Sequence, residues 1–467
     1  MAIKSSVKPG FDGLSIIILL SLIVVGWLMV YAAMYDGQNK YTFLDISTEM
    51  GRQTIFLVLS LIVFGISMLI DWKFWNTFAF LIYGASIVLL ILVLLIGKEI
   101  NGSKSWLFFG PIGFQPAEMA KLGTALAVSS YLSFNKNDIK NRKTLITVLG
   151  IIFLPVAIIL GQPDPGSALV FFSFFILLYR KGLDAIYYIL GFSFVAIFIL
   201  SILVGPLNIL IFGLLFTFAI LSLNYRSDLT GLGISIVPII ATYLSYLGSF
   251  EMGVWTIPII SMLGMTLFLY RIKVTKLVNI VLPITILCIG LAYSTDFAFN
   301  KFLKPHQQDR INVWLRPELC DPRGSLYNLI NSKMAISSGG FEGKGFLNGE
   351  MTKLNYVPEQ HTDFIFSTVG EEQGFIGGFS IILLFTLLII QSIRIAERSR
   401  LEFIKNYAYT VAGILFVHFF INIGMTIGLM PVIGIPLPFI SKGGTSLISF
   451  TLLVGIMIRM DAAKNRI

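Results

Sequence analysis

The sequence predicts an all-α polytopic membrane protein with about 14 transmembrane helices, and three observations support this prediction. The 467 residues are 56% hydrophobic and only 13% charged, which is too few polar residues to cover a soluble domain. Apolar runs of about 18–22 residues recur along the chain, and each can cross a hydrocarbon core of about 30 Å. Basic residues concentrate in alternate linkers between these runs, as they do in membrane proteins.

The apolar runs form three groups, with six runs before residue 181, five in the middle and three at the end. The first run is too long for the core of a typical signal peptide, so we expect it to remain as a span. The expected spans are 14–34, 53–70, 78–97, 118–132, 144–160, 166–179, 185–204, 207–223, 231–248, 254–270, 277–293, 375–393, 407–429 and 445–458.

The distribution of lysine and arginine predicts which linkers face the cytoplasm. Basic residues fill the linkers 135–143, 180–181, 271–276 and 394–405 and the tail after residue 458, whereas the linkers near Gly205 and Ser249 contain none. The positive-inside rule then predicts a multi-pass protein of the bacterial inner membrane with both termini in the cytoplasm. The net charge of +9 therefore reflects topology, and we expect no nucleic-acid partner.

The segment 294–363 is about 70 residues long and is predicted to lie outside the membrane, before the last three spans. It contains aromatic as well as polar residues, so we expect short helices at the membrane surface and not a disordered loop. The chain has no glycine-rich phosphate loop and no HExxH or GxSxG motif, so we expect no organic cofactor. The two cysteines, Cys288 and Cys320, form no zinc or disulfide pattern, and no metal-ligating residues are predicted.

The densest polar segment surrounds the start of the span that follows the outer loop. It contains Glu359, His361, Asp363, Glu371 and Glu372. Ionisable groups at the rim of a membrane cavity are costly unless they serve a purpose. Partial desolvation would raise the pKa of the Asp363 carboxyl and make it a better base near neutral pH. The residues alone favour equally a second interpretation, in which Asp363 only caps the following helix.

Basic residues are unusually frequent in the outer loop. Such a set suits an anionic ligand such as a pyrophosphate, which arginine grips with two hydrogen bonds. The alternative is a group of solvated charges that pair with acidic residues of the same loop. The set consists of Lys301, Lys304, His306, Arg310, Arg316, Arg323, Lys333, Lys344 and Lys353.

Two segments interrupt the helical pattern. Asp164 lies between two prolines, so no continuous helix passes through it, and it belongs either to a cavity lining or to a simple outer turn. The segment 428–445 contains three prolines and four glycines, which predicts a re-entrant or broken segment whose backbone groups face a substrate.

Two polar pairs occur at helical spacing. Glu118 and Lys121 lie three residues apart in the fourth span, where we expect them to pair with each other in a mainly structural role. His418 and Asn422 lie four residues apart, and we expect them to form hydrogen bonds between helices.

Together these motifs resemble the SEDS family of membrane proteins (shape, elongation, division and sporulation). The resemblance covers the first six spans, the outer loop and the last three spans. The run Ser-Gly-Gly followed by Gly-Lys-Gly favours the rod-elongation branch over the division branch. The matching motifs are Trp106 with 114–121, Gln162-Pro-Asp164, Lys304-Pro-His-Gln307, Asp321-Pro-Arg-Gly324, Ser338-Gly-Gly340, Gly343-Lys-Gly345, 358–374 and 434–441.

The resemblance implies a peptidoglycan glycosyltransferase that polymerises lipid II on the outer face of the inner membrane during cell elongation. It also implies a class B penicillin-binding protein, which is a transpeptidase, and other membrane proteins of the elongation machinery as partners. The essential acidic residue of the family corresponds to Asp363, so the resemblance favours catalysis over capping for this residue.

The chain departs from the family pattern at several places. Ser105, with Lys104 beside it, stands where an arginine is usual, Asn331 replaces a glutamine, and Lys442 replaces a tyrosine. About four spans exceed the usual complement. We therefore expect the N-terminal helices in 1–180, inserted helices in 181–276, and the C-terminal helices in 277–467 with the outer loop at 294–366.

The implied mechanism uses Asp363 as the general base on the sugar 4-hydroxyl of one lipid II, which attacks the anomeric carbon of another. The departing pyrophosphate needs positive charge, from loop side chains or from a divalent cation such as Mg²⁺ or Mn²⁺. The expected substrate-binding residues are Lys304, Arg310, Arg316, Lys344, Lys104, His361, Glu359, Asp164, Glu118 and Lys121.

Two other functions fit the sequence, a transporter that flips lipid II and a non-catalytic scaffold for a transpeptidase. An ion-coupled transporter should carry ionisable residues near the middle of the membrane. Most predicted spans have interiors without charge, and the charges gather at the outer surface. A scaffold would leave Asp363 and the basic set without a role.

Overall fold

The structure is a computed structural model that describes residues 11–35, 45, 48–100, 102–110, 112–134, 138–206, 208–209, 211–213, 240, 260 and 275–463. The chain divides into two compact units, and each is described by itself. Unit 1 comprises Met1–Asp184 and Cys320–Ile467, and unit 2 comprises Ala185–Leu319. In the described part of the chain, eight helices are long and apolar enough to span a membrane. The all-α polytopic prediction is thereby confirmed.

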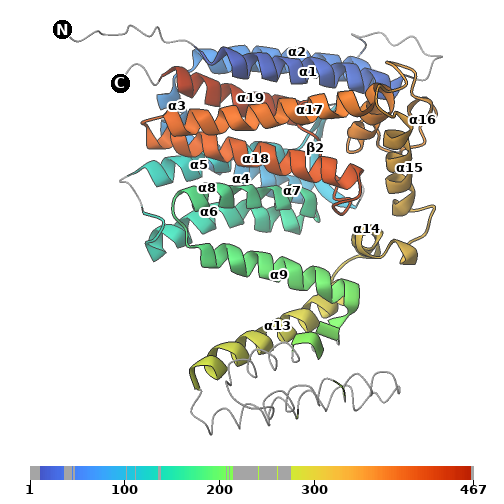
Figure 1. Ribbon diagram of the computed structural model, residues 1–467. Helices are drawn as coiled ribbons and strands as arrows, with labels where there is room; N and C mark the ends of the chain where they lie inside the picture. Colours follow the sequence, from blue (N-terminus) through green and yellow to red (C-terminus); the bar gives the residue numbers. More distant parts are fainter. Residues whose placement is uncertain are drawn as a thin grey trace. The chain divides into compact units, whose positions relative to one another are not determined.

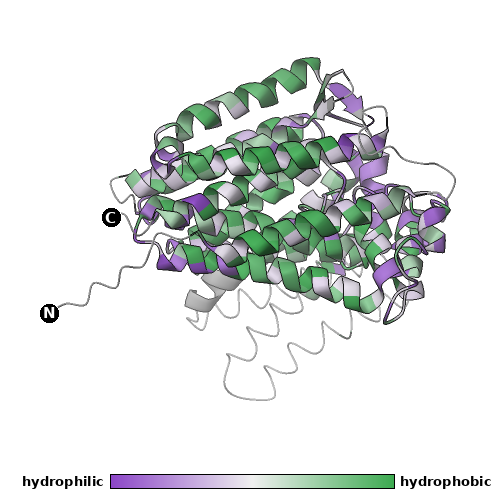
Figure 2. Ribbon diagram, turned by 90° about the horizontal axis from the view of Figure 1, so that it is seen from above, coloured by the Kyte–Doolittle hydropathy of each residue, from purple (hydrophilic) through white to green (hydrophobic). Residues whose placement is uncertain are grey.

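The long helices of unit 1 lie side by side (Figure 1). Helix α2 packs on α19, α17 packs on α18, and α1 packs on α17. Figure 2 shows hydrophobic residues over most of their length and hydrophilic residues toward their ends. These helices come from the two ends of the chain. They are α1 (Gly13–Met34), α2 (Glu49–Leu69), α17 (Ile365–Arg398), α18 (Glu402–Thr426) and α19 (Gly444–Ala462).

The remaining helices of unit 1 complete the bundle, and α5 is its most buried member because it packs against α4, α6, α18 and α19. As the two prolines around Asp164 predict, α6 and α7 are separate helices. These helices are α3 (Trp72–Thr77), α4 (Ala79–Ile96), α5 (Pro116–Ser133), α6 (Arg142–Gly161), α7 (Pro165–Val170), the 3₁₀ turn η2 (Phe171–Ser173) and α8 (Phe174–Arg180).

A small antiparallel sheet between α4 and α5 was not expected from the sequence. Its strands are β1 (Lys98–Ile100), β2 (Ser103–Phe109) and β3 (Ile112–Phe114), in the order β1-β2-β3. The Ser103 hydroxyl and the Lys104 N–H both donate to the Gln162 carbonyl, at 2.9 and 3.1 Å. The sheet is therefore tied to the turn between α6 and α7.

Helix α17 links the two ends of unit 1. It runs through 34 residues, from Ile365 to Arg398, and contains a break at Gly374. At its C-terminal end, Arg398 binds Asp12 beside the start of α1 and Asp461 in the last turn of α19. At its N-terminal end lie the short helices α15 (Ser325–Ser338) and α16 (Glu350–Lys353), which confirm that the segment 294–363 forms short helices (Figure 1).

Unit 2 contains α9 (Ala185–Val204), α13 (Thr275–Lys301), α14 (Pro305–Leu315) and the 3₁₀ turn η3 (Pro317–Leu319). Helices α9 and α13 pack together, and the Ser201 hydroxyl donates to the Ala292 carbonyl at 2.8 Å. The expected spans at 207–223, 231–248 and 254–270, most of the linker 271–276 and the tail after residue 463 lie largely outside the described residues. The total of about 14 spans and the limits of the inserted helices stay predictions.

Candidate active site

Asp363 lies in the turn 359–364 at the N-terminal end of α17, and its side chain is half-buried. The turn is held rigidly because the Gln360 Nε2 lies 2.8 Å from each of three oxygens, those of Ala33 O, Thr352 O and Asn355 Oδ1. The N-cap position of α17 is Phe364, which provides no side-chain cap. Asp363 therefore lies one residue before the N-cap position, which disfavours the capping interpretation.

A charged cluster adjoins Asp363. Glu49, the first residue of α2, binds the Lys442 ammonium, and the His361 Nε2 lies 3.9 Å from the same Glu49 oxygen. Burial lowers the pKa of His361, and the positive charge of Lys442 lowers it further, while Glu49 and Glu359 oppose the shift. The lysine that departs from the family pattern thus forms an ion pair beside the candidate base. Glu359 itself is exposed and accepts a hydrogen bond from the Thr362 hydroxyl at 2.9 Å.

The segment between α18 and α19 has no regular helix, as predicted, and neighbouring side chains satisfy its backbone. The Lys442 N–H donates to the His361 carbonyl at 2.8 Å, which joins the segment to the turn that carries Asp363. Asn422 and His418 on α18 contact the carbonyls of Ile435 and Pro436, at 2.7 and 3.2 Å. The broken backbone is therefore bound at several points, not loose.

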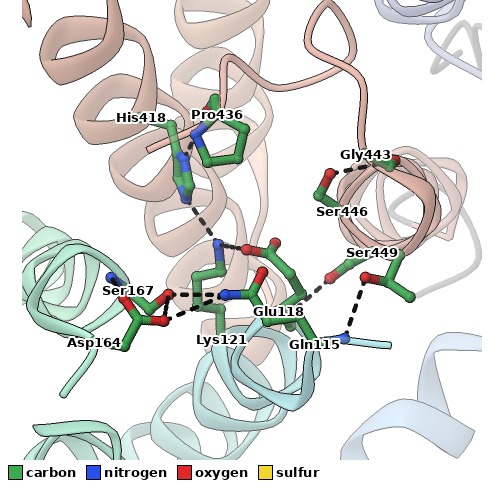
Figure 3. A network of polar contacts seen from close by, with 11 residues as sticks. Gln115, Glu118, Lys121, Asp164, Ser167, His418, Pro436, Gly443, Ser446 and Ser449 are labelled. Atoms are coloured by element: carbon green, nitrogen blue, oxygen red, sulfur yellow. Dashed lines mark hydrogen bonds and ion pairs between the residues drawn. The ribbon is translucent and has the colours of Figure 1, made fainter. Parts of the chain in front are cut away.

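Three motifs that are far apart in the sequence meet in one polar network (Figure 3). The Lys121 ammonium lies 2.8 Å from Glu118 Oε1 and 2.8 Å from His418 Nε2, and all three side chains are buried. The expected Glu118–Lys121 pair is confirmed, and its position in the first two turns of α5 places it near one end of that helix. A neighbouring part of the network contains Gln115, whose amide donates to Asp164 Oδ2 at 3.3 Å. Asp164 caps α7 by accepting from the Ser167 N–H at 3.1 Å.

Lys344 forms an ion pair with a buried carboxylate, a structural role that the sequence did not predict. Its ammonium is 3.0 Å from Glu371 Oε1, and the Glu371 side chain is 0% exposed. The same carboxylate accepts from the Met351 N–H at 2.9 Å, and from the N–H and hydroxyl of Thr352 at 2.9 and 2.7 Å. We call these groups the Glu371 cage. Because the cage already engages Lys344, its expected role in substrate binding stays a prediction.

The loop that contains Lys344 fits a break in α17. Gly374 has φ +62° and ψ −156°, which is not helical. The loop backbone pairs with the backbone groups on both sides of the break. The N–H groups of Lys344 and Gly345 donate to the carbonyls of residues 371 and 372. In the opposite direction, the N–H groups of residues 375 and 376 donate to the carbonyls of residues 340 and 341. A Cβ at Gly374 would lie 2.3 Å from the Gly343 nitrogen, so the position requires glycine.

The other expected basic residues are divided between the two units. Lys104 is exposed on β2 in unit 1. Lys304, Arg310 and Arg316 belong to unit 2, where they lie on or beside α14, and Arg316 donates to the Leu203 carbonyl at 3.2 Å. Among the residues that the structure describes, no three His, Cys, Asp or Glu side chains form a group able to hold a metal ion.

Chemically, unit 1 offers a half-buried carboxylate on a rigid turn, a cationic side chain nearby and a bound but irregular backbone segment. This arrangement suits proton abstraction from a hydroxyl group by Asp363. Three contributors were not expected as site residues: Gln115, Lys442 and Asn422. For Lys442, the departure from the family pattern was the sequence feature that could have indicated its place in the site.

The protein-family model for FtsW, RodA and SpoVE, described as "Cell cycle protein", matches residues 13–212 and 206–466. The chain is 29% identical over 457 residues to the peptidoglycan glycosyltransferase RodA of Treponema pallidum, covering 97% of this chain and 98% of the relative. It is 28% identical to the peptidoglycan glycosyltransferase MrdB of Escherichia coli, covering 98% and 95%. It is 29% identical to the stage V sporulation protein E of Bacillus subtilis, covering 97% and 98%.

Two solved structures share the fold. A chain from a peptidoglycan synthase complex that coordinates polymerization and crosslinking matches with a TM-score of 0.63 and 23% identity, covering 98% of this chain and 99% of that chain. The rod shape determining protein RodA of Thermus thermophilus matches with a TM-score of 0.56 and 20% identity, covering 97% and 98%.

Proposed function

Because the chain belongs to the FtsW/RodA/SpoVE family of cell cycle proteins, which is the SEDS family expected from its motifs, we propose that it is a peptidoglycan glycosyltransferase. It polymerises lipid II into glycan strands during cell-wall synthesis. Relatives with this activity in their names align with nearly the whole chain, so the resemblance is not confined to one half of the fold. The observation that carries the proposal is a half-buried Asp363 on a rigid turn, at the end of the bundle where polar groups gather.

In the proposed reaction, the Asp363 carboxylate takes the proton from the sugar 4-hydroxyl of the acceptor lipid II. The oxygen attacks the anomeric carbon of the donor, the bond from that carbon to the diphosphate oxygen breaks, and undecaprenyl pyrophosphate leaves with inversion. A positioned general base contributes about 10²–10⁴-fold to the rate, which corresponds to about 3–5 kcal/mol. Alignment of the two lipids contributes further.

The leaving pyrophosphate carries negative charge that must be stabilised as the bond breaks. In our proposal, basic side chains provide this stabilisation, and the candidates that the sequence indicates are Lys304, Arg310, Arg316 and Lys104. A divalent cation, Mg²⁺ or Mn²⁺, would enter with the phosphates of the substrate, which are good oxygen ligands for either ion.

The protein is a multi-pass membrane protein, and we propose that it resides in the bacterial inner membrane with both termini in the cytoplasm. The Arg398 contacts support this arrangement, because they gather the start of α1 and the end of α19 at the end of α17 that is opposite Asp363. In the proposed complex, a class B penicillin-binding protein crosslinks the strands as they form. Other elongation proteins complete the assembly.

A transporter of lipid II is the alternative, and one observation bears on it. The buried Glu118, Lys121 and His418 form the kind of ionisable cluster that a transporter would use. However, Glu118 and Lys121 lie in the first two turns of α5, not at its middle. Their opposite charges cancel, which fits a structural ion pair better than a site for ion coupling.

The proposal is tested by incorporating the purified protein into liposomes with labelled lipid II and separating the products by chain length. The parent protein should form glycan strands, and Asp363→Asn, which preserves shape but cannot accept the proton, should lose about 10²–10⁴-fold in rate. Asp321→Asn is the matched control, because Asp321 is an exposed carboxylate of the same outer segment. Polymerisation by Asp363→Asn at the parental rate would show that another group is the base.

A further inference from the structure

The geometry points to Asn422 as the positioning residue for Asp363, an inference that rests on the proposed function. Asn422 lies on α18, is 0% exposed, and is not expected to touch substrate. Its Nδ2 donates to the backbone carbonyl of Asp363 at 2.9 Å and to the carbonyl of Ile435 at 2.7 Å. The two hydrogens of one amide group thus join the turn of the candidate base to the irregular segment between α18 and α19.

This joint is specific because neither carbonyl belongs to a helical ladder. Asp363 lies before the N-cap residue Phe364, and the nearby Ser367 N–H bonds to the Phe364 carbonyl at 2.9 Å and not to that of Asp363. Ile435 lies in a segment without regular structure. The Ile435 carbonyl is buried and that of Asp363 is partly buried, so each needs a donor, and a single side chain supplies it to both.

A second contact keeps the same two segments in register. The Lys442 N–H donates to the His361 carbonyl at 2.8 Å, two residues before Asp363.

His418, one turn before Asn422 on α18, also contacts the irregular segment. Its Nδ1 lies 3.2 Å from the Pro436 carbonyl, and its Nε2 lies 2.8 Å from the Lys121 ammonium. Because Nδ1 must donate to a carbonyl, the histidine is the neutral Nδ1–H form, and its Nε2 accepts from Lys121.

Asn422 is therefore the point at which the base, the irregular segment and the buried helix α18 meet. Loss of its amide would free the turn to shift relative to the irregular segment between α18 and α19. Displacement of a reacting group by about 1 Å can cost on the order of 10²-fold in rate even when the mutated residue is far from the reacting atoms. Removal of the amide should therefore lower kcat more than it changes the KM for lipid II.

The chain offers a matched control on the same helix. Asn406 is also 0% exposed on α18, and its Nδ2 donates to the Ser129 carbonyl at 3.4 Å. In both asparagines, Oδ1 has no hydrogen-bond partner among the described residues. Asn406→Leu thus removes a buried amide from α18 without touching the turn of Asp363, and separates loss of helix packing from loss of positioning.

The experiment compares Asn422→Leu, Asn406→Leu and Asp363→Asn with the parent in the lipid II polymerisation assay, with thermal stability measured on each. Asn422→Leu should lower kcat about 10- to 100-fold with the KM within about threefold of the parent. Asn406→Leu should keep kcat within about threefold. If both leucine variants lose kcat equally, or if Asn422→Leu retains the parental kcat, the positioning role is wrong.

Asn422→Asp provides a second measurement in case the leucine variant does not fold. An ionised carboxylate would oppose two carbonyl oxygens, whereas a protonated one can donate to one of them. The kcat of Asn422→Asp should therefore recover partly as the pH is lowered, relative to the parent at each pH, and a flat ratio would contradict the inference. An inactive parent, or an Asp363→Asn variant as active as the parent, would overturn the proposed function instead, so the two failures are distinguishable.

Discussion

Replacement of Lys344 by methionine tests whether this lysine anchors the outer loop or binds the substrate. Methionine keeps the aliphatic length of the side chain and removes the charge. In the structure the ammonium lies 3.0 Å from the fully buried Glu371 carboxylate, and the side chain of Lys344 is 26% exposed. We expect Lys344→Met to destabilise the loop and to leave the KM for lipid II nearly unchanged.

The magnitude follows from the Glu371 cage. Two charges 3.0 Å apart interact by about 5 kcal/mol at an effective dielectric constant of about 20, which is an upper bound before desolvation. Three donors would remain on the carboxylate in the variant, from Met351 and Thr352. One charge-assisted hydrogen bond contributes about 1.5–3 kcal/mol net. We therefore expect a loss of about 2 kcal/mol in the free energy of unfolding, and less if solvent reaches the exposed part of Lys344.

The assay combines thermal unfolding in detergent with limited proteolysis of the outer segment, and a double-mutant cycle with Glu371→Gln isolates the pair. Lys353→Met is the matched control, since Lys353 lies in α16 of the same segment and outside the cage. An unchanged unfolding midpoint together with a large rise in KM would refute the anchoring role. It would instead support the expected role of Lys344 in substrate binding.

Three further predictions concern other parts of the fold. Gly26→Ala places a Cβ about 2.1 Å from the Phe439 carbonyl oxygen, so it should destabilise the protein by about 1–3 kcal/mol. Gly84→Ala is the control, because a Cβ there has no atom within 4 Å and should not destabilise the protein. Chemical unfolding of the two variants measures the difference. Lys121→Met should cost about 3–5 kcal/mol, because it leaves Glu118 buried without its partner, and the double variant with Glu118→Gln should recover much of this loss in the same assay. The pKa of His361 is lowered by burial, so the unfolded state binds more protons below its ordinary pKa of about 6.5, and stability should fall as the pH drops from about 7 toward 5. His361→Asn should flatten this dependence when unfolding midpoints are measured across that range, and an equally steep profile would contradict the assignment.

The sequence predicted the helical architecture well because apolar length alone determines most spans. The run 185–204 coincides with α9 (Ala185–Val204), and the short run 118–132 corresponds to the buried α5. The start of α17 was placed at 375, although the helix begins at Ile365. Two adjacent glutamates, Glu371 and Glu372, are typical of the end of a span, and the sequence does not show that both are buried. The small sheet was missed despite an Asn-Gly turn signal at 101–102, since the fold class left no place for strands.

The candidate site was predictable only where its contacts are local. The Glu118–Lys121 pair follows from helical spacing, and the structure confirms it. The expectation that Asn422 bonds to another helix was wrong, because its acceptors are non-helical carbonyls, 59 and 13 residues away in the chain. No pattern of residue types encodes which backbone carbonyl a distant amide will meet. For Lys344, the charge suggested a ligand, and no sequence pattern indicated that its ammonium also pairs with a buried carboxylate.

The break in α17 at Gly374 constrains how this protein can vary in length. Four backbone hydrogen bonds join the two sides of the break to residues 340, 341, 344 and 345, with a fixed count of residues between them. Insertion or deletion of one residue in that loop would shift the pairing and leave donors and carbonyls unsatisfied beside the buried Glu371 and Glu372. Changes in loop length should therefore be selected against between Gly339 and Gly345.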